Sequence, residues 1–361
     1  YSLGRLKQLE NDHQGAIPLY RKILDRKPGS GLVWNNLGVA FRETGRPEKA
    51  MAGFESAVRL APELAEAWNN LGVAQDEQRL AKKARKSYQT AIDLQPDYIS
   101  PHLNLGILHQ KAGRFKAAEA HYDRVLKIQP DHEIAIFMRQ SIRGEETPDA
   151  APVEHVRSIF NQCADNFETI LVRDLKYRTP ELLFNLVRPW LTRDMTILDL
   201  GCGTGLGAQL YRPFSRHLSG VDVSENMLKK AWEKKIYDHL ELFDVLQEWR
   251  FEKPFDLIYS SDVFVYFGRL EPIISSAARA LARNGIIAFS VEELKAARAD
   301  YRLNASGRYA HSRGYLHTCL VRCGLTVIKI SETDIRNQSG EPVSGILVAA
   351  QKQTEKGSEK L

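Results

Sequence analysis

The sequence has 361 residues, too many for one ordinary core, so we expect more than one domain. Its hydrophobic fraction of 43% and charged fraction of 26% exclude a disordered or fibrous chain. We see no signal segment and no apolar run near the roughly 18–20 residues that a membrane span needs. The four cysteines are scattered without metal-ligand spacing, which predicts reduced thiols, no metal site and a cytoplasmic location.

The formal charge of +5 is unevenly distributed. Residues 1–144 hold 22 Lys and Arg against 16 Asp and Glu, whereas the remainder is close to neutral. The densest basic cluster comprises Lys82, Lys83, Arg85 and Lys86. Because no aromatic residue interleaves it and no nucleic-acid motif occurs, we interpret it as a solvated helix face and expect no nucleic-acid partner.

The first elements along the chain are repeats. "WNNLG" occurs at residues 34–38 and again at 68–72, a spacing of 34 residues. The same spacing relates glycine, alanine, aromatic and proline positions in three complete copies and in a partial copy at the start. This pattern resembles the tetratricopeptide repeat. The resemblance implies an all-α superhelix over residues 1–143, with a capping helix after the last repeat and further repeats before Tyr1.

The sixth position of each complete repeat carries the same residue type: Asn36, Asn70 and Asn104. In this repeat the position faces the concave groove, and the pattern resembles the asparagine ladder of O-linked N-acetylglucosamine transferase. A side-chain amide both donates and accepts, so it can hold a peptide backbone of any sequence. The alternative is that each Asn pairs within the stack of helices.

The repeats are followed by a change of pattern. Residues 144–154 are polar and rich in proline and alanine, which predicts a linker. Residues 155–193 have helical periodicity, and seven apolar strand patterns then alternate with helical ones, as in a parallel sheet with crossover helices. We expect an α/β domain over residues 155–352 and a disordered tail over 353–361.

The segment "LDLGCGTGLGA" connects the first of these strands to a helix. Its glycines at 201, 203 and 205 let the backbone approach a ligand at the carboxyl end of the strand. The run from Gly203 to Ala208 also satisfies the dinucleotide fingerprint. Two features argue against a dinucleotide: Asp199 would repel a pyrophosphate, and a further acid, Asp244, follows the third strand.

These features resemble class I S-adenosylmethionine-dependent methyltransferases. The resemblance implies a Rossmann-like fold with a seven-stranded, mostly parallel sheet, and S-adenosyl-L-homocysteine as the product formed from the cofactor. Gly201, Gly203 and Gly205 would line the methionine portion, with Asp199 near its amino group. Asp222 would accept the ribose hydroxyls. The remaining implied contacts are Val223, Met227, Asp244 and Val245 around the adenine, and Ser261.

More narrowly, the chain is similar to bacterial predicted methyltransferases fused to tetratricopeptide repeats. The shared stretches are "ADNFETILVRDLKYRTPELL", "SSDVFVYFGRLEPI", "GIIAFSVEE" and "GRYAHSRGYL". The first of these would form a helical lid, with Tyr177 and Arg178 beside the cofactor carboxylate. Its aromatic spacing fits core packing equally well.

Candidate bases lie near the carboxyl ends of the later strands: Asp262, Tyr266, Glu292 and His311. His311 has the intrinsic pKa best suited to a base, while a structural role is as plausible. We expect a methyltransferase whose repeat arm recruits a protein or peptide acceptor. Two alternatives remain open, a small-molecule methyltransferase that docks a partner protein and a scaffold with an inert cofactor domain.

Overall fold

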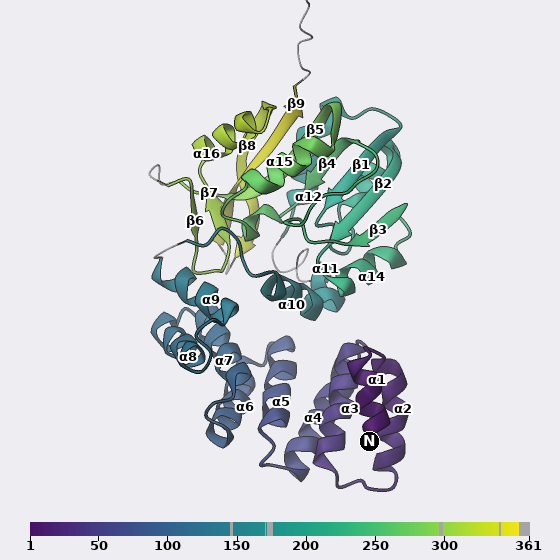
Figure 1. Ribbon diagram of the computed structural model, residues 1–361, viewed down its shortest axis with the longest axis vertical. Helices are drawn as coiled ribbons and strands as arrows, with labels where there is room; N and C mark the ends of the chain where they lie inside the picture. Colours follow the sequence, from purple (N-terminus) through teal and green to yellow (C-terminus); the bar gives the residue numbers. More distant parts are fainter. Residues whose placement is uncertain (145–146, 170, 172–175, 296–298, 339–340, 354–361) are drawn as a thin grey trace, which may run out of the picture. The chain divides into compact units, whose positions relative to one another are not determined.

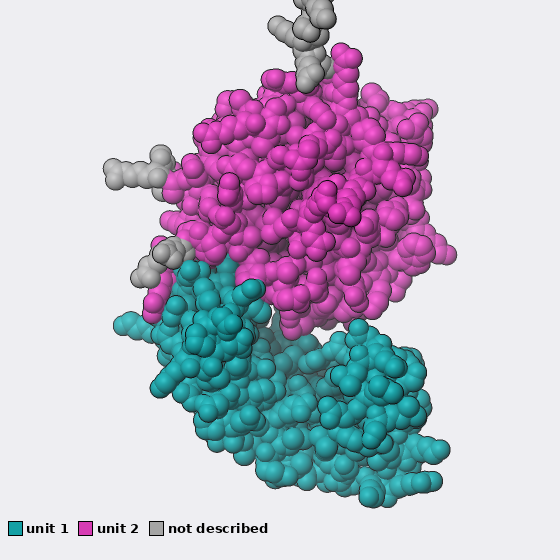
Figure 2. All heavy atoms as spheres, in the orientation of Figure 1, with its two compact units in different colours: residues 1–142 teal, residues 143–361 magenta. Residues whose placement is uncertain are grey.

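The structure is a computed structural model that describes residues 1–144, 147–169, 171, 176–295, 299–338 and 341–353. The chain forms two compact units, residues 1–142 and 143–361 (Figures 1 and 2). Residues 354–361 of the predicted tail (353–361) and part of the predicted lid, residues 170 and 172–175, lie outside the described residues. No helix of the described ranges is long and apolar enough to cross a membrane.

Unit 1 consists of antiparallel helix pairs, as the 34-residue spacing predicts (Figure 1). A ninth helix forms where the sequence predicts a cap. The helices are α1 (Ser2–Leu9), α2 (His13–Leu24), α3 (Gly31–Glu43), α4 (Pro47–Leu60), α5 (Ala65–Glu77), α6 (Ala81–Leu94), α7 (Ile99–Lys111), α8 (Phe115–Ile128) and α9 (Glu133–Arg143).

The repeated glycine explains how the two helices of a pair come so close together. A Cβ atom added to Gly72 would lie 2.5 Å from the Tyr88 ring, and one added to Gly106 would lie 2.5 Å from the Tyr122 ring. A second repeated contact ties each pair to the preceding turn. Trp68 Nε1 donates to Pro62 O at 2.8 Å. The repeat therefore conserves contacts between layers as well as helix positions.

Unit 2 is an α/β unit with a nine-stranded sheet, two strands more than predicted. Five parallel strands run in the order β3-β2-β1-β4-β5, and β8 and β9 continue antiparallel from β5. The strands are β1 (Met195–Leu200), β2 (Ser215–Asp222), β3 (His239–Leu242), β4 (Phe255–Ser260), β5 (Leu281–Glu293), β6 (Tyr301–Leu303), β7 (Tyr309–His311), β8 (Leu325–Gln338) and β9 (Glu341–Lys352).

Helices cover this sheet and build its core. Leu183 on α12 packs with Ile197, Leu257 and Ala349 from three strands, and all four side chains are completely buried. The helices of unit 2, apart from short 3-10 turns, are α10 (Val153–Cys163), α11 (Phe167–Thr169), α12 (Thr179–Val187), α13 (Ala208–Tyr211), α14 (Glu225–Glu233), α15 (Glu271–Ala280) and α16 (Arg313–Arg322).

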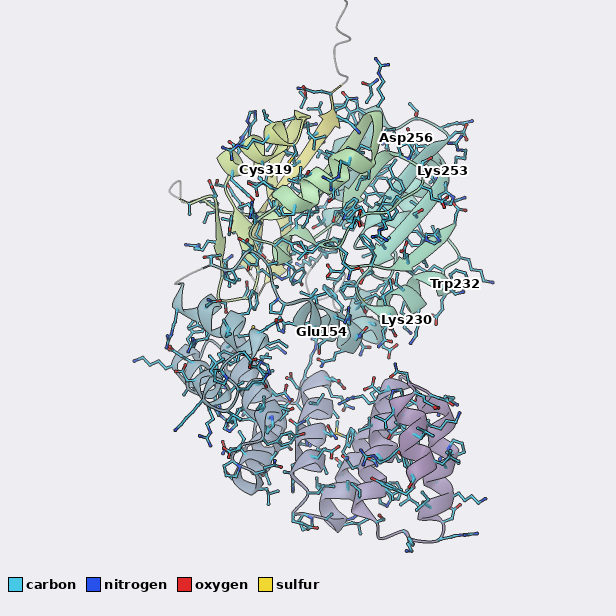
Figure 3. The ribbon with its side chains drawn as sticks, in the orientation of Figure 1. Glu154, Lys230, Trp232, Lys253, Asp256 and Cys319 are labelled. Atoms are coloured by element: carbon cyan, nitrogen blue, oxygen red, sulfur yellow. The ribbon has the colours of Figure 1, made fainter. Side chains whose placement is uncertain are left out.

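The two ends of the sheet differ in what covers them. Figure 3 shows Asp256, at the amino end of β4, far from Glu154 on α10 and Lys230 on α14. Asp256 accepts a hydrogen bond from the Thr196 backbone at 2.8 Å, which ties β4 to β1 at that end. Helices α10 and α14 therefore belong to the carboxyl end of the strands, where parallel sheets bind their ligands.

Part of the predicted linker is held firmly by unit 2. Ala150 forms an isolated antiparallel bridge with Phe267. The backbone oxygen of Asp149 accepts from the Gly268 amide at 2.7 Å and from the Arg269 amide at 3.0 Å. Residues 148–151 are thus a strap on the α/β unit, because their backbone groups find partners there that a free linker would lack.

Candidate functional site

A pocket lies at the carboxyl ends of β1, β2 and β4. Its wall includes the glycine loop after β1, the loop after β2 and the loop after β4, together with α10. Most of the predicted cofactor contacts line it: Tyr177, Asp199, Gly201, Gly203, Asp222, Val223, Asp244, Val245 and Ser261. The parallel topology brings most of these residues together because they lie at or just after the carboxyl ends of neighbouring strands.

The glycine loop and Asp222 are locked to each other. The Gly203 amide donates to one carboxylate oxygen of Asp222 at 2.8 Å, and the Ser224 amide donates to the other at 2.8 Å. Burial raises the pKa of Asp222 to about 6, although these backbone hydrogen bonds act to lower it. Asp222 is therefore a fixed acceptor that is presented to the pocket.

Asp199 occupies the floor of the pocket with one oxygen committed. Its Oδ2 accepts from the hydroxyls of Tyr237 and Tyr259, each at 2.6 Å. Asp199 is 4% exposed, and this burial raises its pKa to about 7. Among the described residues no donor contacts Oδ1. A cationic group bound beside Asp199 would favour the ionised form and lower this pKa.

Two predicted cofactor residues do not line the pocket. Met227 is completely buried on α14, beneath the loop after β2. Gly205 has φ of +76°, and a Cβ atom there would lie 2.9 Å from the Tyr237 ring. Both residues lie behind the pocket lining, and their contacts with the cofactor stay predictions. Arg178 is exposed and also lies outside the lining.

Helix α10 and the residues after it cover the pocket through contacts that the sequence did not reveal. The Ser224 hydroxyl donates to the Asn161 side chain at 2.6 Å. Arg157 donates to the backbone oxygen of Val223 at 3.2 Å. Glu168 accepts from the Thr204 hydroxyl at 2.7 Å and pairs with Lys234. Helix α10 is therefore anchored to the loop after β2, and the predicted lid segment is anchored through Glu168 to the glycine loop, although no motif marks these residues.

An ionic cluster forms the side of the pocket after β4. Arg308 Nη1 donates to Asp262 Oδ2, and Arg336 Nη1 donates to Asp262 Oδ1, both at 3.0 Å. Arg336 also pairs with Glu292. Asp262 and Tyr266 line the pocket, whereas Glu292 does not. Sequence analysis selected the two acids but neither arginine, since their partners lie more than 40 residues away along the chain.

His311 does not fit the role of a base that faces the pocket. It lies on β7, is completely buried, and its Nε2 is 3.1 Å from the backbone oxygen of Gly268. Its ring stacks on Tyr315, with ring centroids 5.9 Å apart. Burial lowers the pKa of His311 to about 4. His311 is absent from the pocket lining, so its position does not suit a base that acts on a bound acceptor.

The residues of the pocket fit S-adenosylmethionine. A carboxylate offers about four acceptor positions. Asp222 and Asp199 each retain some of these, which suits the ribose hydroxyls and the ammonium group. Asp244 accepts from the Leu246 amide with Oδ1 at 3.0 Å and keeps its other oxygen. The buried hydroxyl of Ser261 has no hydrogen-bond partner among the described residues, so a bound group could satisfy it.

In unit 1, the three asparagines pair along the stack. Asn70 Nδ2 donates to Asn35 Oδ1 at 2.9 Å, and Asn104 Nδ2 donates to Asn69 Oδ1 at 3.1 Å. Asn36 Nδ2 donates in the same way to the Tyr1 hydroxyl at 2.9 Å. Each amide thus uses one donor on the preceding repeat, as the alternative interpretation expects. The side chains stay half-buried, and within the described part of the chain no donor is seen on their carboxamide oxygens.

Comparisons with known proteins confirm the predicted class. Residues 171–330 match a family described as "Methyltransferase domain". In unit 1, residues 1–65 and 100–132 match "Tetratricopeptide repeat" families and residues 82–113 match "TPR repeat". The chain therefore carries tetratricopeptide repeats followed by a methyltransferase domain.

Several curated relatives share part of this domain. A malonyl-[acyl-carrier protein] O-methyltransferase of Hamiltonella defensa subsp. Acyrthosiphon pisum is 26% identical over 137 residues, which are 37% of this chain and 51% of that protein. The protein of the same name from Priestia megaterium is 30% identical over 113 residues, 30% of this chain and 41% of that protein. The chain thus matches about half or less of these relatives' length.

Two solved structures are among those that match part of this chain. Magnesium protoporphyrin IX methyltransferase from Synechocystis PCC 6803 with bound SAH has a TM-score of 0.44 and 16% identity, covering 56% of this chain and 99% of that one. N-methyltransferase NodS from Bradyrhizobium japonicum WM9 with S-adenosyl-L-homocysteine has a TM-score of 0.45 and 19% identity, covering 55% and 98%.

Proposed function

We propose that this chain transfers a methyl group from S-adenosylmethionine to an acceptor that its repeat array recruits, and that the acceptor is a protein or a group carried on one. The observation that carries the proposal is the pocket around Asp222, whose buried carboxylate is fixed by the glycine loop. The repeat array on the same chain supports recruitment, since stacked repeats present an extended binding surface.

The chain's own residues would bind and orient the reactants. S-adenosylmethionine, when bound, supplies a methyl carbon activated by the sulfonium. Asp222 would accept from the ribose, Asp199 from the ammonium and Asp244 from the adenine amine. Phe160, Phe167 and Leu171 line the pocket and would exclude water from it. Alignment of this kind is the protein's main contribution to a displacement at an activated carbon.

A second candidate is a small-molecule methyltransferase in which the repeats dock a partner. The lining of the pocket favours it, because every residue of that lining belongs to unit 2. The curated relatives named for malonyl-[acyl-carrier protein] favour the first candidate instead, since their acceptor group is carried on a protein. The two candidates separate by the size of the product. Labelled methyl transfer into a lysate of the source organism yields a labelled polypeptide for the first and a labelled small molecule for the second.

The first prediction tests the asparagine ladder. The double variant Asn70→Ala/Asn104→Ala removes the half-buried amides from the groove, so we expect acceptor labelling to fall roughly tenfold, the effect of losing about 1.4 kcal/mol of binding. Affinity for S-adenosylhomocysteine, measured by calorimetry, should stay unchanged, because the methyltransferase pocket contains neither residue.

A matched control uses the stacking partners of these two residues. The variant Asn35→Ala/Asn69→Ala breaks the same hydrogen bonds from the other side, and both of its residues are buried. We expect it to lower the thermal stability of the array while acceptor labelling persists at a temperature where the array is folded. If both double variants lose labelling equally, the asparagines are structural and the groove contact is wrong.

A further inference from the structure

The two guanidinium groups of the ionic cluster are in different situations. Arg336 is 3% exposed, and its two terminal nitrogens donate hydrogen bonds to Asp262 and Glu292. Arg308 lines the pocket, and its side chain is 24% exposed. One is therefore a buried counterion, and the other is accessible to a ligand.

Arg308 has donors to spare. Its Nη1 donates to Asp262 at 3.0 Å and lies 4.0 Å from Glu292 Oε1, and within the described ranges its Nε and Nη2 make no hydrogen bond. The guanidinium lies over the Tyr266 ring, 5.6 Å from its centroid, which fixes the plane of the group. A planar guanidinium with two free donors is suited to a carboxylate.

The charges of the cluster disfavour a cationic acceptor. Asp262 accepts one guanidinium hydrogen bond on each oxygen, and Glu292 is paired with Arg336 and accepts from Asn304 at 3.3 Å. The positive charges of the two arginines thus neutralise the negative charges of the two acids. An ammonium acceptor would meet the uncommitted side of Arg308 and the positive sulfonium of the methyl donor, whereas an anion is attracted by both.

Among the described residues, this side of the pocket offers no free base. Asp262 is committed to arginines, and burial raises the pKa of Tyr266 above its ordinary value. Glu292 and His311 are absent from the pocket lining. An alcohol or an ammonium must lose a proton before it can attack, but a carboxylate is already ionised at neutral pH.

We propose that the methyl acceptor is a carboxylate, that Arg308 anchors it, and that the product is a methyl ester. This inference rests on the proposed methyl transfer. A lone pair of the carboxylate oxygen forms the new O–C bond while the methyl–sulfur bond breaks and its electron pair stays on sulfur. No proton moves, and a neutral ester and a neutral thioether are formed. The carboxylate belongs either to a polypeptide or to a small molecule.

The experiment uses the full chain, S-adenosylmethionine labelled in its methyl group, and a lysate of the source organism. Labelled products are separated by size and then treated with dilute base, and volatile labelled methanol is measured. Esters hydrolyse under these conditions, so we expect most of the label to be released from whichever size fraction carries it. Label that stays bound as an N-methyl, S-methyl or ether group overturns the proposal. Failure of the chain to bind S-adenosylhomocysteine would instead contradict the proposed function.

Variants of Arg308 test the anchoring residue. We expect Arg308→Gln to reduce labelling roughly 30-fold or more, in line with the loss of one partner of a buried charged pair. Arg308→Lys keeps the charge without the fork and should lose less. Affinity for S-adenosylhomocysteine should be unchanged in both. If it falls as much as labelling does, Arg308 holds the cofactor's own carboxylate and the proposal is overturned. Arg302→Gln, at an exposed site on β6, is the control with unchanged labelling.

Discussion

Asp199 combines two opposed properties at the scale of a single residue. Its burial favours the neutral acid, and the proposed ammonium partner favours the carboxylate. Since the folded pKa of about 7 lies above the ordinary aspartate value of 3.8, Asp199 stabilises the ligand-free fold fully below pH 3.8. That contribution is lost as the pH rises through 7.

The variant Asp199→Asn makes this opposition measurable. An amide oxygen can accept from Tyr237 and Tyr259 without any charge to bury. We therefore expect the ligand-free variant to be more stable than the natural chain by roughly 2–4 kcal/mol at pH 8, since each pKa unit corresponds to about 1.4 kcal/mol. The gain should vanish near pH 4, as followed by denaturant unfolding at both values.

The same variant should gain stability without a ligand but lose affinity for the cofactor. We expect affinity for S-adenosylhomocysteine at pH 8 to fall about tenfold or more, because a charge-assisted hydrogen bond to the ammonium is weakened. The natural chain should lose affinity as the pH falls from 8 to 6, when Asp199 becomes protonated. A variant that is destabilised at pH 8, or that binds normally, contradicts this account of the residue.

Sequence reasoning located this residue but could not foresee its partners. Asp199, Asp222 and Asp244 lie at or just after the ends of strands, and apolar runs in the sequence predict where those strands end. Tyr237 and Tyr259 reach Asp199 from 38 and 60 residues away, and no local pattern marks a tyrosine that will donate to a buried acid. The same limit explains why Arg308 was overlooked, whereas His311 was selected on intrinsic pKa alone.

At the scale of elements, the glycine of each repeat sets the distance between paired helices. Replacing Gly72 by Ala puts a Cβ atom 2.5 Å from the Tyr88 ring, inside the contact distance of carbon atoms. Alanine raises helix propensity by about 1 kcal/mol, but overpacking costs about 1–3 kcal/mol. We expect packing to win, with a net loss of about 1 kcal/mol in the unfolding of the array.

Gly29 offers the control for that measurement. It lies in the turn before α3, and a Cβ atom there would meet nothing within 4 Å. Gly29→Ala should leave the denaturation midpoint of the array, followed by far-ultraviolet circular dichroism, nearly unchanged. Equal midpoints for Gly72→Ala and the natural chain would show that the helices can separate without cost.

Helices and strands were predicted correctly where the sequence has a repeat of fixed length or a long apolar run. The 34-residue repeat and the seven longer strands have such signals. Strands β6 and β7 have three residues each, too few to show an alternation of apolar and polar residues. They pair antiparallel with each other, and Tyr301 lies opposite His311. Short strands of this kind are defined by tertiary pairing, and that pairing is what placed His311 in the interior.

For the whole molecule, the boundary of the methyltransferase domain follows from backbone hydrogen bonds. Composition placed the start of this domain at residue 155, after a polar linker. Yet the Ala151 amide donates to the backbone oxygen of Tyr266 at 2.8 Å, and the Tyr309 hydroxyl donates to Pro148 O at 2.8 Å. Because these groups bond within unit 2, the strap at residues 148–151 belongs to the domain.

Two truncations test this boundary. A chain of residues 144–361 keeps the strap, and one of residues 155–361 lacks it and leaves the Gly268 and Arg269 amides without their acceptor. Each lost hydrogen bond is worth about 0.5–1.5 kcal/mol, so we expect the longer chain to be more stable by about 2–4 kcal/mol in denaturant unfolding. The strap also leads directly into α10, whose residues Arg157 and Asn161 hold the loop after β2. We therefore expect the shorter chain to bind S-adenosylhomocysteine more weakly as well. Equal stability and equal affinity would return residues 144–154 to the role of a simple linker.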